Sequence, residues 1–596
     1  MLPNNIILNL QVKQNMMKKL TTLILATLIY ATASSQCLPD GITFTTQAQI
    51  DSFQTDYPGC TEIIGDVIID GDDISSLIGL NVLSTINGNL IVGSWSSNVN
   101  PLLANLNGLD NLVVINEDLK ILHCQSLTDL GGLESLSSIG NDLIIRSNFF
   151  LNEISSLSNI TTIGNDIFIY NNISLDSLVG LDGITRINDI TIDLNDAITD
   201  LDGLQNIDSI FGFFSLQVNE SLTSLQALSS LNYIMSLSIS TNNNLVDLSG
   251  LEGLTKIDGY LSVMQNSGLL SLTGLENIDS IGKHLTIQKN NSLPNITGLE
   301  NIGIISEGLT INSNNALTTI SGLDSLSILG GTLTIQNNPS LQSIGQIGSI
   351  TEIEIGGYLI IEWNTSLEDM SGLENITTIG ASLAISYNDN LQSIAGLENL
   401  DSITGSLIIR WNNKLNDLSA LLNITSIDGL INIRDNFVLT SLYGLDNIEY
   451  ESISKLNIIN NPNLSTCEVQ SVCDYLSSPN STVEISSNAS GCNSQDEVEY
   501  ACETVSVNEV SISNQLSIYP NPFTTSTSFE YTLQQPSTVR ISIFNYLGEQ
   551  VEEIRKEQPS GKQQVVWNAE GLSPGVYFYR IVAGDRVASG KMIINK

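Results

Sequence analysis

The chain has 596 residues, and its 63 acidic against 21 basic side chains give a formal net charge of −42. Residues 37–515 carry a net charge of −46, which should repel nucleic acids and anionic lipid surfaces. Divalent cations and basic partners remain open, although a charged surface of this kind is usually just solvated. The sequence contains no glycine-rich phosphate loop, HExxH motif or nucleophile elbow.

Residues 1–36 are expected to comprise an N-terminal extension and an export signal. Lys18 and Lys19 precede an apolar run from Leu20 to Tyr30, and the small residues of ATASSQ follow it. The run is too short to span a bilayer stably, and no later segment is long and apolar enough to do so. A lipoprotein anchor on Cys37 is the alternative, but Gln36 is too large for the position before a lipid-modified cysteine.

Residues 37–62 are expected to cover the start of a repeat array. The stretch from Thr45 to Cys60 predicts a short helix capped by Thr45 or Thr46, and Cys37 and Cys60 flank it as a candidate disulfide. The acidic loop Ile69–Asp73 is a weak calcium candidate because it lacks the full ligand pattern. We expect no other metal and no cofactor.

A phrase of 23 or 24 residues recurs about sixteen times between residues 63 and 465. One copy, GLENIDSIGKHLTIQKNNSL, begins at Gly274, and another, GLENITTIGASLAISYNDNL, begins at Gly372. A fixed period of this length predicts a solenoid in which each coil packs against its neighbours. Leu285 and Ile287 share one face of a short strand that Asn290 ends, so each coil should add one parallel strand, about 4.8 Å from the last.

The spacing L-x-I-x-x-N resembles the strand core of leucine-rich repeats. The whole phrase, GLxNIxxIGxxLxIxxNxxL, resembles the receptor L-domain family over residues 63–465. The resemblance implies a parallel β-helix-like stack and an extracellular ligand-binding role. It implies no binding residues, because the family shares core positions rather than surface positions.

Aromatic residues interrupt the phrase in three consecutive coils. Trp363, Tyr387 and Trp411 each occupy the position before the asparagine, and Arg410 and Arg434 lie beside them. Stacked coils would bring the three rings into a ladder, whose faces could bind sugar rings or anchor a protein partner. The alternative is a ladder that stabilises the stack and binds nothing. The phrase is also irregular around Trp95.

An enzyme is the main alternative to a binding protein, because right-handed β-helix folds host polysaccharide lyases and glycosidases. Such enzymes use carboxylates or basic groups on the outer face of the stack. Most acids of this chain instead sit in the repeated phrase, as Glu276, Glu300, Glu374 and Glu398 do after Gly-Leu, and we therefore expect a structural role for them. We expect no enzymatic activity; a structural surface-layer role without a specific ligand is a further alternative.

Residues 466–503 carry four of the seven cysteines and are expected to cover the end of the array. The stretch from Cys467 to Leu476 predicts a helix. The four cysteines allow three connectivities, of which we favour Cys467–Cys492 and Cys473–Cys502, and the absence of a CxxC pair argues against zinc. Cys124 is left over and is expected to be a buried free thiol.

Residues 504–515 are expected to form a linker and residues 516–596 a small antiparallel β-sandwich, because apolar residues alternate between Gly and Pro turns. The succession YPNPF, FNYLGEQV, VVWNAEGLSPGVYFYRI and GKMIINK resembles the type A sorting domain of the type IX secretion system of Bacteroidota. The resemblance implies export across the outer membrane through that machinery, followed by release or attachment to the cell surface. A generic carbohydrate-binding or fibronectin-like sandwich is the alternative.

The sequence thus predicts a chain dominated by β-structure: a parallel solenoid of about sixteen coils with short capping helices, then a β-sandwich. Its expected role is recognition or adhesion outside the cell, with an extracellular glycan or protein as ligand and no nucleic-acid partner.

Overall fold

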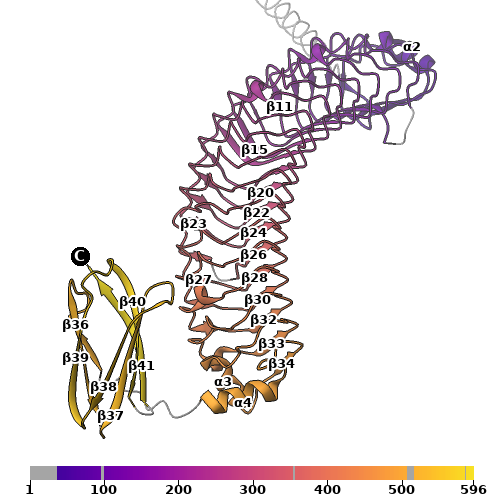
Figure 1. The fold of residues 1–596 in the computed structure, drawn as a ribbon. Coiled ribbons are helices and arrows are strands. Elements are labelled where there is room, and N and C mark those ends of the chain that lie inside the picture. Colours follow the sequence, from indigo (N-terminus) through magenta and orange to yellow (C-terminus); the bar gives the residue numbers. More distant parts are fainter. Residues whose placement is uncertain are drawn as a thin grey trace, which may run out of the picture. The chain divides into compact units, whose positions relative to one another are not determined.

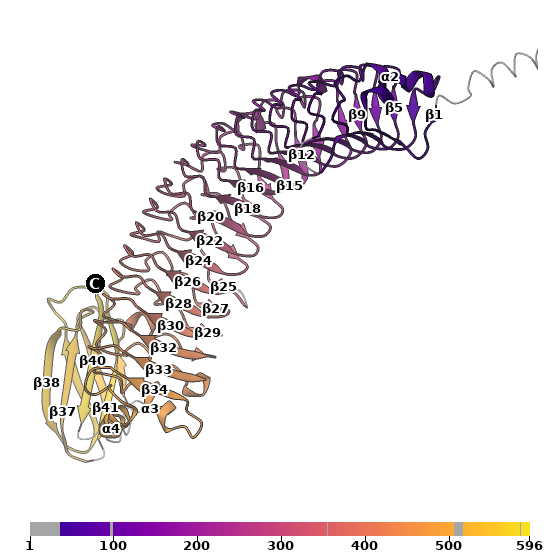
Figure 2. The ribbon, with the colours of Figure 1, turned by 90° about the vertical axis from the view of Figure 1, so that its right-hand side faces the viewer.

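The computed structural model describes residues 36–95, 99–353, 356–505, 516–533, 535–583 and 586–595. They form two compact units. The first consists of the described residues up to Thr466 together with Gln470–Ala489. The second consists of Cys467–Val469 and the described residues from Ser490 onward. The first is a parallel solenoid and the second is built from antiparallel sheets (Figures 1 and 2). The predicted export signal and most of the predicted linker lie outside the described residues. The limits given for the other segments stay predictions.

Each coil contributes a strand to one long parallel ladder, and equivalent residues pair in register, as Leu285 does with Leu309 and Ile287 with Ile311. The strands of this long ladder are β2 (Ile42–Phe44), β4 (Val67–Ile69), β6 (Leu90–Gly93), β8 (Leu119–Leu122), β10 (Leu143–Arg146), β12 (Ile167–Tyr170), β14 (Ile190–Asp193), β15 (Ser209–Gln217), β16 (Tyr233–Ser240), β18 (Leu261–Met264), β20 (Leu285–Gln288), β22 (Leu309–Asn312), β24 (Leu333–Gln336), β26 (Leu359–Glu362), β28 (Leu383–Ser386), β30 (Leu407–Arg410), β32 (Leu430–Arg434), β33 (Lys455–Ile459) and β34 (Val483–Ser486).

Most coils also contribute a second, two-residue strand, so the prediction of one strand per coil was incomplete. These short strands are β1 (Gln36–Cys37), β3 (Glu62–Ile63), β5 (Thr85–Ile86), β7 (Val114–Ile115), β9 (Ser138–Ile139), β11 (Thr162–Ile163), β13 (Arg186–Ile187), β17 (Lys256–Ile257), β19 (Ser280–Ile281), β21 (Ile304–Ile305), β23 (Ile328–Leu329), β25 (Glu352–Ile353), β27 (Thr378–Ile379), β29 (Ser402–Ile403) and β31 (Ser426–Ile427). The long strands β15 and β16 run through both positions.

Glycine makes the turns between these strands possible. Gly274 has a φ of 110°, and a Cβ there would lie 2.1 Å from the carbonyl oxygen of Leu248 in the preceding coil. A side chain is therefore excluded both by the backbone conformation and by the neighbouring coil. The apolar residues of the phrase then point inward, and Leu275, Ile278, Leu285 and Ile287 are all fully buried.

A column of buried asparagines joins the coils at the end of the long strands. Asn290 donates its backbone N–H to Oδ1 of Asn314 over 3.0 Å, and its Nδ2 donates to the carbonyl oxygen of Val263 over 2.9 Å. Each asparagine therefore bonds the coils on both sides, the preceding coil through its side chain and the next through its backbone N–H. These bonds satisfy polar groups that water cannot reach. From the coil of Asn148 onward, the other fully buried members are Asn148, Asn172, Asn195, Asn219, Asn242, Asn266, Asn338, Asn364, Asn388, Asn412, Asn436 and Asn461, and Asn100 joins two earlier coils in the same way.

The residue before each asparagine adopts the left-handed backbone conformation. Lys289 has a φ of 55° and Ser313 a φ of 59°, and the same holds in each coil along the column. This conformation costs a non-glycine residue about 1–2 kcal/mol. It turns the chain so that the following amide points inward, and the hydrogen bonds of the column offset the cost.

Cys124 occupies the asparagine position in its coil. Its backbone N–H donates to Oδ1 of Asn148 over 3.0 Å, but its thiol offers Asn100 Nδ2 only a contact of 3.9 Å. The prediction of a buried free thiol is confirmed, and burial raises the pKa of Cys124 to about 12.

The segments expected to cover the array also extend it. Strand β2 lies within residues 37–62 and strand β34 within residues 466–503, and the solenoid has about 18 turns rather than sixteen. Helix α2 (Gln47–Asp56) follows Thr46 as predicted, and the side chain of Gln49 accepts a hydrogen bond from the Thr46 N–H over 3.1 Å. Single helical turns complete five coils: η1 (Ile78–Leu80), η2 (Ser155–Leu157), η3 (Gln226–Leu228), η4 (Ser419–Leu421) and η5 (Tyr450–Ser452).

The cysteine predictions hold at both ends. Cys37 bonds Cys60, Cys467 bonds Cys492 as favoured, and Cys473 and Cys502 are disulfide-bonded as well. Helix α3 (Gln470–Ser477) lies within the predicted stretch. Helix α4 (Gln495–Val505) was not predicted, although Ser494 caps it by accepting a hydrogen bond from Glu497 N–H over 3.2 Å.

The second unit contains two antiparallel sheets, as predicted. Phe529, Ile541, Trp567 and Met592 share its buried core. One sheet has the order β35-β36-β39 and the other β38-β37-β40-β41. The strands are β35 (Ser517–Tyr519), β36 (Ser526–Leu533), β37 (Ser537–Phe544), β38 (Gln550–Gln558), β39 (Gly561–Asn568), β40 (Gly575–Ala583) and β41 (Arg586–Ile594).

Replacing one asparagine of the column should destabilise the solenoid strongly. Asn314→Ala leaves the N–H of Asn290 and the carbonyl of Ile287 without their amide partner. Each unpaired buried group costs about 1–3 kcal/mol, so the free energy of unfolding should fall by about 2–5 kcal/mol in urea denaturation followed by circular dichroism. Asn315→Ala, at the exposed neighbour, should change it by less than about 0.5 kcal/mol. Equal losses in both variants would contradict the role of the column.

Completing the column at its cysteine should stabilise the protein. Cys124→Asn offers an amide oxygen to Asn100, as Asn148 already does to Cys124. One added buried hydrogen bond predicts a gain of about 1 kcal/mol in the same denaturation measurement. Cys124→Ser removes the thiol without supplying the amide and should not raise the free energy of unfolding. An equal rise in this variant would show that the thiol itself destabilises the solenoid.

Candidate ligand-binding surface

The outer surface of the long ladder is formed by alternate strand residues. Within a strand such as β26, Leu359 and Ile361 are buried while Ile360 and Glu362 face outward. The next residue along, in the left-handed conformation, also projects from the coil. Two adjacent lines of side chains therefore run along the solenoid, one from the strand ends and one from the turn position before each asparagine.

The turn positions of three consecutive coils form an aromatic column, consisting of Trp363, Tyr387 and Trp411. Their φ angles are 61°, 59° and 57°, as the turn requires. The ring centroids of Trp363 and Tyr387 lie 3.9 Å apart and those of Tyr387 and Trp411 5.9 Å apart, with 6° between the planes in both pairs. The ring ladder expected from the spacing is thus present.

Stacking covers most of the ring faces, which sequence reasoning did not anticipate. Tyr387 lies between two indoles, and the outer side of Trp411 meets Phe437 edge-on at 6.0 Å and 82°. Trp363 is 44% exposed, and the preceding coil carries Asn337 rather than a ring at the equivalent position. The column therefore offers a ligand one open indole face, at Trp363, and the edges of the other rings.

The strand ends beside the aromatic column carry charge. The Nε of Arg410 donates to Oγ of Ser386 over 3.2 Å, and its guanidinium carbon lies 5.7 Å from the ring centroid of Tyr387. An Nη of Arg410 also lies 3.8 Å from Glu362 Oε1. Arg410 is thus held against the column while its side chain remains 38% exposed.

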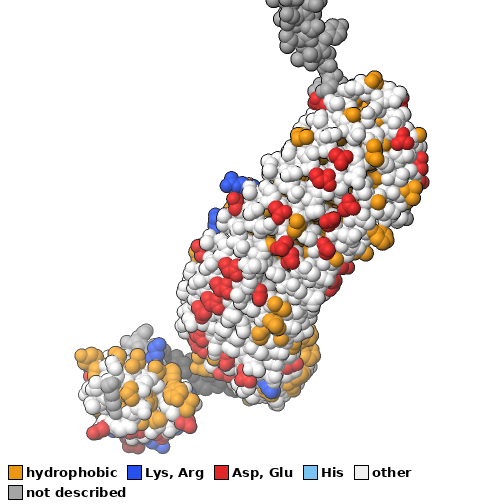
Figure 3. Space-filling model, turned by 90° about the horizontal axis from the view of Figure 1, so that it is seen from above, with side chains coloured by type: hydrophobic (Ala, Val, Ile, Leu, Met, Phe, Trp, Pro, Cys, Tyr) orange, Lys and Arg blue, Asp and Glu red, His pale blue; other side chains and the backbone are white. Residues whose placement is uncertain are grey.

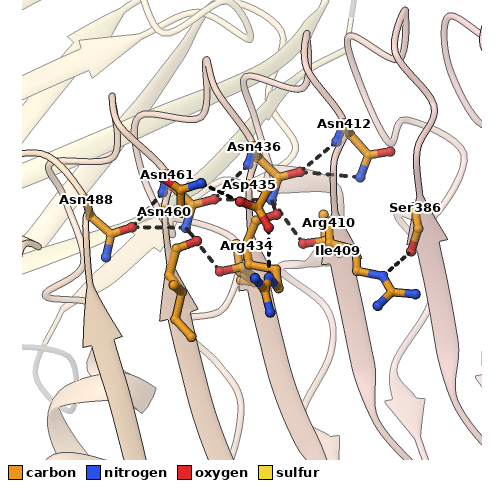
Figure 4. A network of polar contacts seen from close by, with 12 residues as sticks. Ser386, Ile409, Arg410, Asn412, Arg434, Asp435, Asn436, Asn460, Asn461 and Asn488 are labelled. Atoms are coloured by element: carbon orange, nitrogen blue, oxygen red, sulfur yellow. Dashed lines mark hydrogen bonds and ion pairs between the residues drawn. The ribbon is translucent and has the colours of Figure 1, made fainter.

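Arg434 is held by its own neighbours (Figure 4). Its Nε donates to Oδ2 of Asp435 over 2.8 Å, and Asn460 donates to the other oxygen of the same carboxylate. Asn412, Asn436 and the next two members of the asparagine column run behind these groups and fix the coils that carry them. A guanidinium has five N–H donors, and the contacts of Arg434 within the described residues leave donors for a ligand.

The consensus glutamates have structural partners. In six coils a glutamate after Gly-Leu accepts the N–H of the glycine two residues before it, over 2.7–3.0 Å; the acceptors are Glu134, Glu252, Glu276, Glu300, Glu374 and Glu398. In the weak calcium candidate Ile69–Asp73, the Asp73 carboxylate accepts the Gln47 N–H over 3.1 Å. Over the part of the chain that the structure describes, no group of three or more His, Cys, Asp or Glu side chains is arranged to hold a metal ion.

A second aromatic and cationic group lies in the first third of the solenoid. The guanidinium of Arg146 lies over the rings of both Trp95 and Tyr170. Sequence reasoning noted the irregular stretch around Trp95 but missed Arg146 and Tyr170. The available signal was that Arg146 and Tyr170 end the strands of adjacent coils, at the position that Arg410 and Arg434 hold later in the chain.

Both groups stand out from an acidic surface. On the face of the solenoid shown in Figure 3, Asp and Glu side chains are scattered along the stack and Lys and Arg side chains are few. The acids do not gather into one patch there, which agrees with their place in the repeated phrase.

Comparison with known families agrees with both resemblances. Residues 517–595 match the model of the secretion system C-terminal sorting domain, and residues 401–503 match that of the receptor L domain. The second match begins later than the 63–465 expected and continues through α3 into α4. No curated protein matches the chain.

The sorting domain places this protein at the cell surface or in the extracellular space, and its export implies contact with the secretion machinery. The receptor L-domain match fits a binding role, and it includes Arg410, Trp411 and Arg434. The described residues contain no helix with the length and apolar character needed to cross a membrane.

The aromatic column should contribute little to stability. In Trp363→Asn/Trp411→Asn, asparagine adopts the left-handed turn more readily than tryptophan, as Asn337 already does. That gain of about 1 kcal/mol offsets the lost stacking of about 0.5–1.5 kcal/mol per ring pair. Urea denaturation should place the double variant within about 2 kcal/mol of the parent. A loss of about 4 kcal/mol or more would identify the column as a structural element.

Proposed function

We propose that this protein is a non-enzymatic recognition protein that acts outside the cell and binds a glycan through the aromatic column and the arginines beside it. The observation that carries the proposal is the placement of three large rings, in consecutive coils, at a turn position that needs none. Other coils make the same turn with Ser313, Asn337 or Asp435.

The free protein gains little stability from rings at this position. Bulky residues are uncommon in the left-handed conformation, and Trp363 exposes much of its indole to water. The asparagine column closes each coil whether or not a ring precedes it. A ligand that covers the open indole face would remove that exposed apolar area from water.

The chemistry around Trp363 fits a sugar. A sugar ring can lay its C–H face on an indole while its hydroxyls bond polar groups at the rim. Glu362 supplies an acceptor, Arg410 supplies donors, and the Asn337 amide in the adjoining coil supplies both. The surface runs across several coils, which suits a glycan chain lying along the solenoid.

The acids near the column support a binding role rather than catalysis. Glycoside hydrolysis uses two carboxyl groups about 5–10 Å apart, one of them free to act as a base or nucleophile. Here Glu362 faces Arg410, and Asp435 is bonded by Arg434 and Asn460. These carboxylates therefore position the neighbouring arginines, which suits recognition of a ligand better than acid–base catalysis.

Glycan binding can be tested with the secreted protein on a glycan array, followed by calorimetry on the best ligand. Trp363→Asn/Trp411→Asn should weaken binding at least about tenfold, since loss of one aromatic anchor commonly costs about 1–2 kcal/mol. Tyr443→Asn, at a 54% exposed aromatic elsewhere in the solenoid, is the matched control and should bind as the parent does.

Four outcomes would overturn the proposal. A folded double variant with unchanged affinity would place the binding site elsewhere. Binding on a protein array but on no glycan array would make the column a protein-recognition surface. Cleavage of a bound polysaccharide would indicate an enzyme, and silence on both arrays would favour a structural surface-layer role.

A further inference from the structure

Arg146 lies in an apolar setting near the start of the solenoid. It ends strand β10, and in register beside it Tyr170 ends strand β12. In the coil before β10 the equivalent position is Leu122. The remaining neighbour is Trp95, which comes from the irregular stretch after β6. An arginine flanked by these residues sits between side chains that carry no charge.

The rings hold the guanidinium in place. Its central carbon lies 4.9 Å from the centroid of Tyr170 and 5.5 Å from that of Trp95, both within the range of a cation–π contact. Tyr170 is itself stacked on Phe168, with centroids 5.6 Å apart and 13° between the planes. Trp95 is 59% exposed, so its indole remains open to a ligand.

The charge of Arg146 is unpaired in an otherwise acidic solenoid. Arg186, Arg410 and Arg434 each lie within ion-pair distance of a carboxylate. Among the described residues Arg146 has no such partner, and its Nε is buried without a hydrogen bond. A guanidinium that keeps its charge and lacks an internal acceptor is ready for an oxyanion from outside.

His123 adds a neutral polar group at the same place. It lies one coil before Arg146, and its backbone N–H donates to the Arg146 carbonyl oxygen over 2.9 Å. Burial and the nearby guanidinium lower the pKa of His123, so the imidazole stays uncharged at neutral pH. It can donate or accept a hydrogen bond without competing for the anion.

We propose that Trp95, Arg146 and Tyr170 form a second ligand site, which takes a single carboxylate or sulfate carried by an otherwise neutral glycan. Arg146 binds the oxyanion and the exposed indole of Trp95 packs against the sugar ring. The site is separate from the aromatic column and does not depend on the function proposed for it.

The negative charge of the solenoid favours a ligand that carries one anionic group over a ligand that carries many. A net charge of −46 over residues 37–515 repels a polyanion as it approaches. At physiological ionic strength that field is screened beyond about 8 Å, whereas the guanidinium–oxyanion contact forms at hydrogen-bond distance. One anionic group on a neutral sugar gains the contact and avoids most of the repulsion.

Three matched probes test the site by calorimetry on the secreted protein: lactose, 3′-sialyllactose and lactose 3′-sulfate. At least one acidic probe should bind about tenfold more tightly than lactose. The carboxylate and sulfate arms show which oxyanion is preferred, and either preference supports the site. Arg146→Gln should abolish the difference from lactose, while Arg186→Gln, which removes the same charge from an exposed arginine, should preserve it.

Several results would overturn the proposal. Equal binding of lactose and both acidic probes to the parent protein would do so, as would equal losses in Arg146→Gln and Arg186→Gln. If Trp363→Asn/Trp411→Asn loses the preference for the acidic probe, the anion site lies at the aromatic column and the proposal is wrong. If that variant keeps the preference, the anion site is separate, even if the column itself binds no ligand. Should Arg146→Gln fail to fold, Trp95→Ala changes a side chain that is 59% exposed and outside the core of the solenoid. This variant should weaken binding of the acidic probe, and unchanged binding would contradict the site.

Discussion

The solenoid depends on one repeated interaction, the buried amide that bonds two neighbouring coils at once. Each asparagine accepts the backbone N–H of the coil before it and donates to a strand carbonyl of that same coil, as Asn314 does for Asn290 and Ile287. This requirement fixes the left-handed residue before the amide and the length of the strand that leads to it. The apolar interior and the two parallel ladders follow, because equivalent residues must then lie in register.

Since the interior is the same in every coil, the coils differ from one another mainly in their outward-facing side chains. The strand ends and the left-handed turns are the two lines where side chains vary without disturbing the amide column. Both candidate sites lie on these lines, yet they hold their cations differently. Arg410 and Arg434 are positioned by Glu362 and Asp435, whereas Arg146 is positioned by aromatic rings and keeps its charge available.

Some of the acidic residues have a structural explanation. The glutamates after Gly-Leu accept the N–H of a glycine turn, as Glu276, Glu300 and Glu398 do. The sorting domain fits a solenoid that works outside the cell, where its disulfides are stable. Cys124 is the exception to the asparagine column, and it remains reduced because it is buried away from the other cysteines.

Local patterns determined much of this protein: the period, the inward Leu285 and Ile287, the asparagine turns, helix α2, the Cys467–Cys492 bond and the sorting domain. The solenoid features were readable because they recur at a fixed spacing, and the helix, the disulfide and the sorting domain because each arises from a short, continuous stretch of sequence. Tertiary structure decided the second ladder, the extra coils within the capping segments, and the mutual stacking that leaves only Trp363 with an open face. It also brought Trp95 to Arg146, two coils away. Such contacts depend on which coils adjoin and on where a left-handed turn directs a side chain, and spacing along the chain specifies neither.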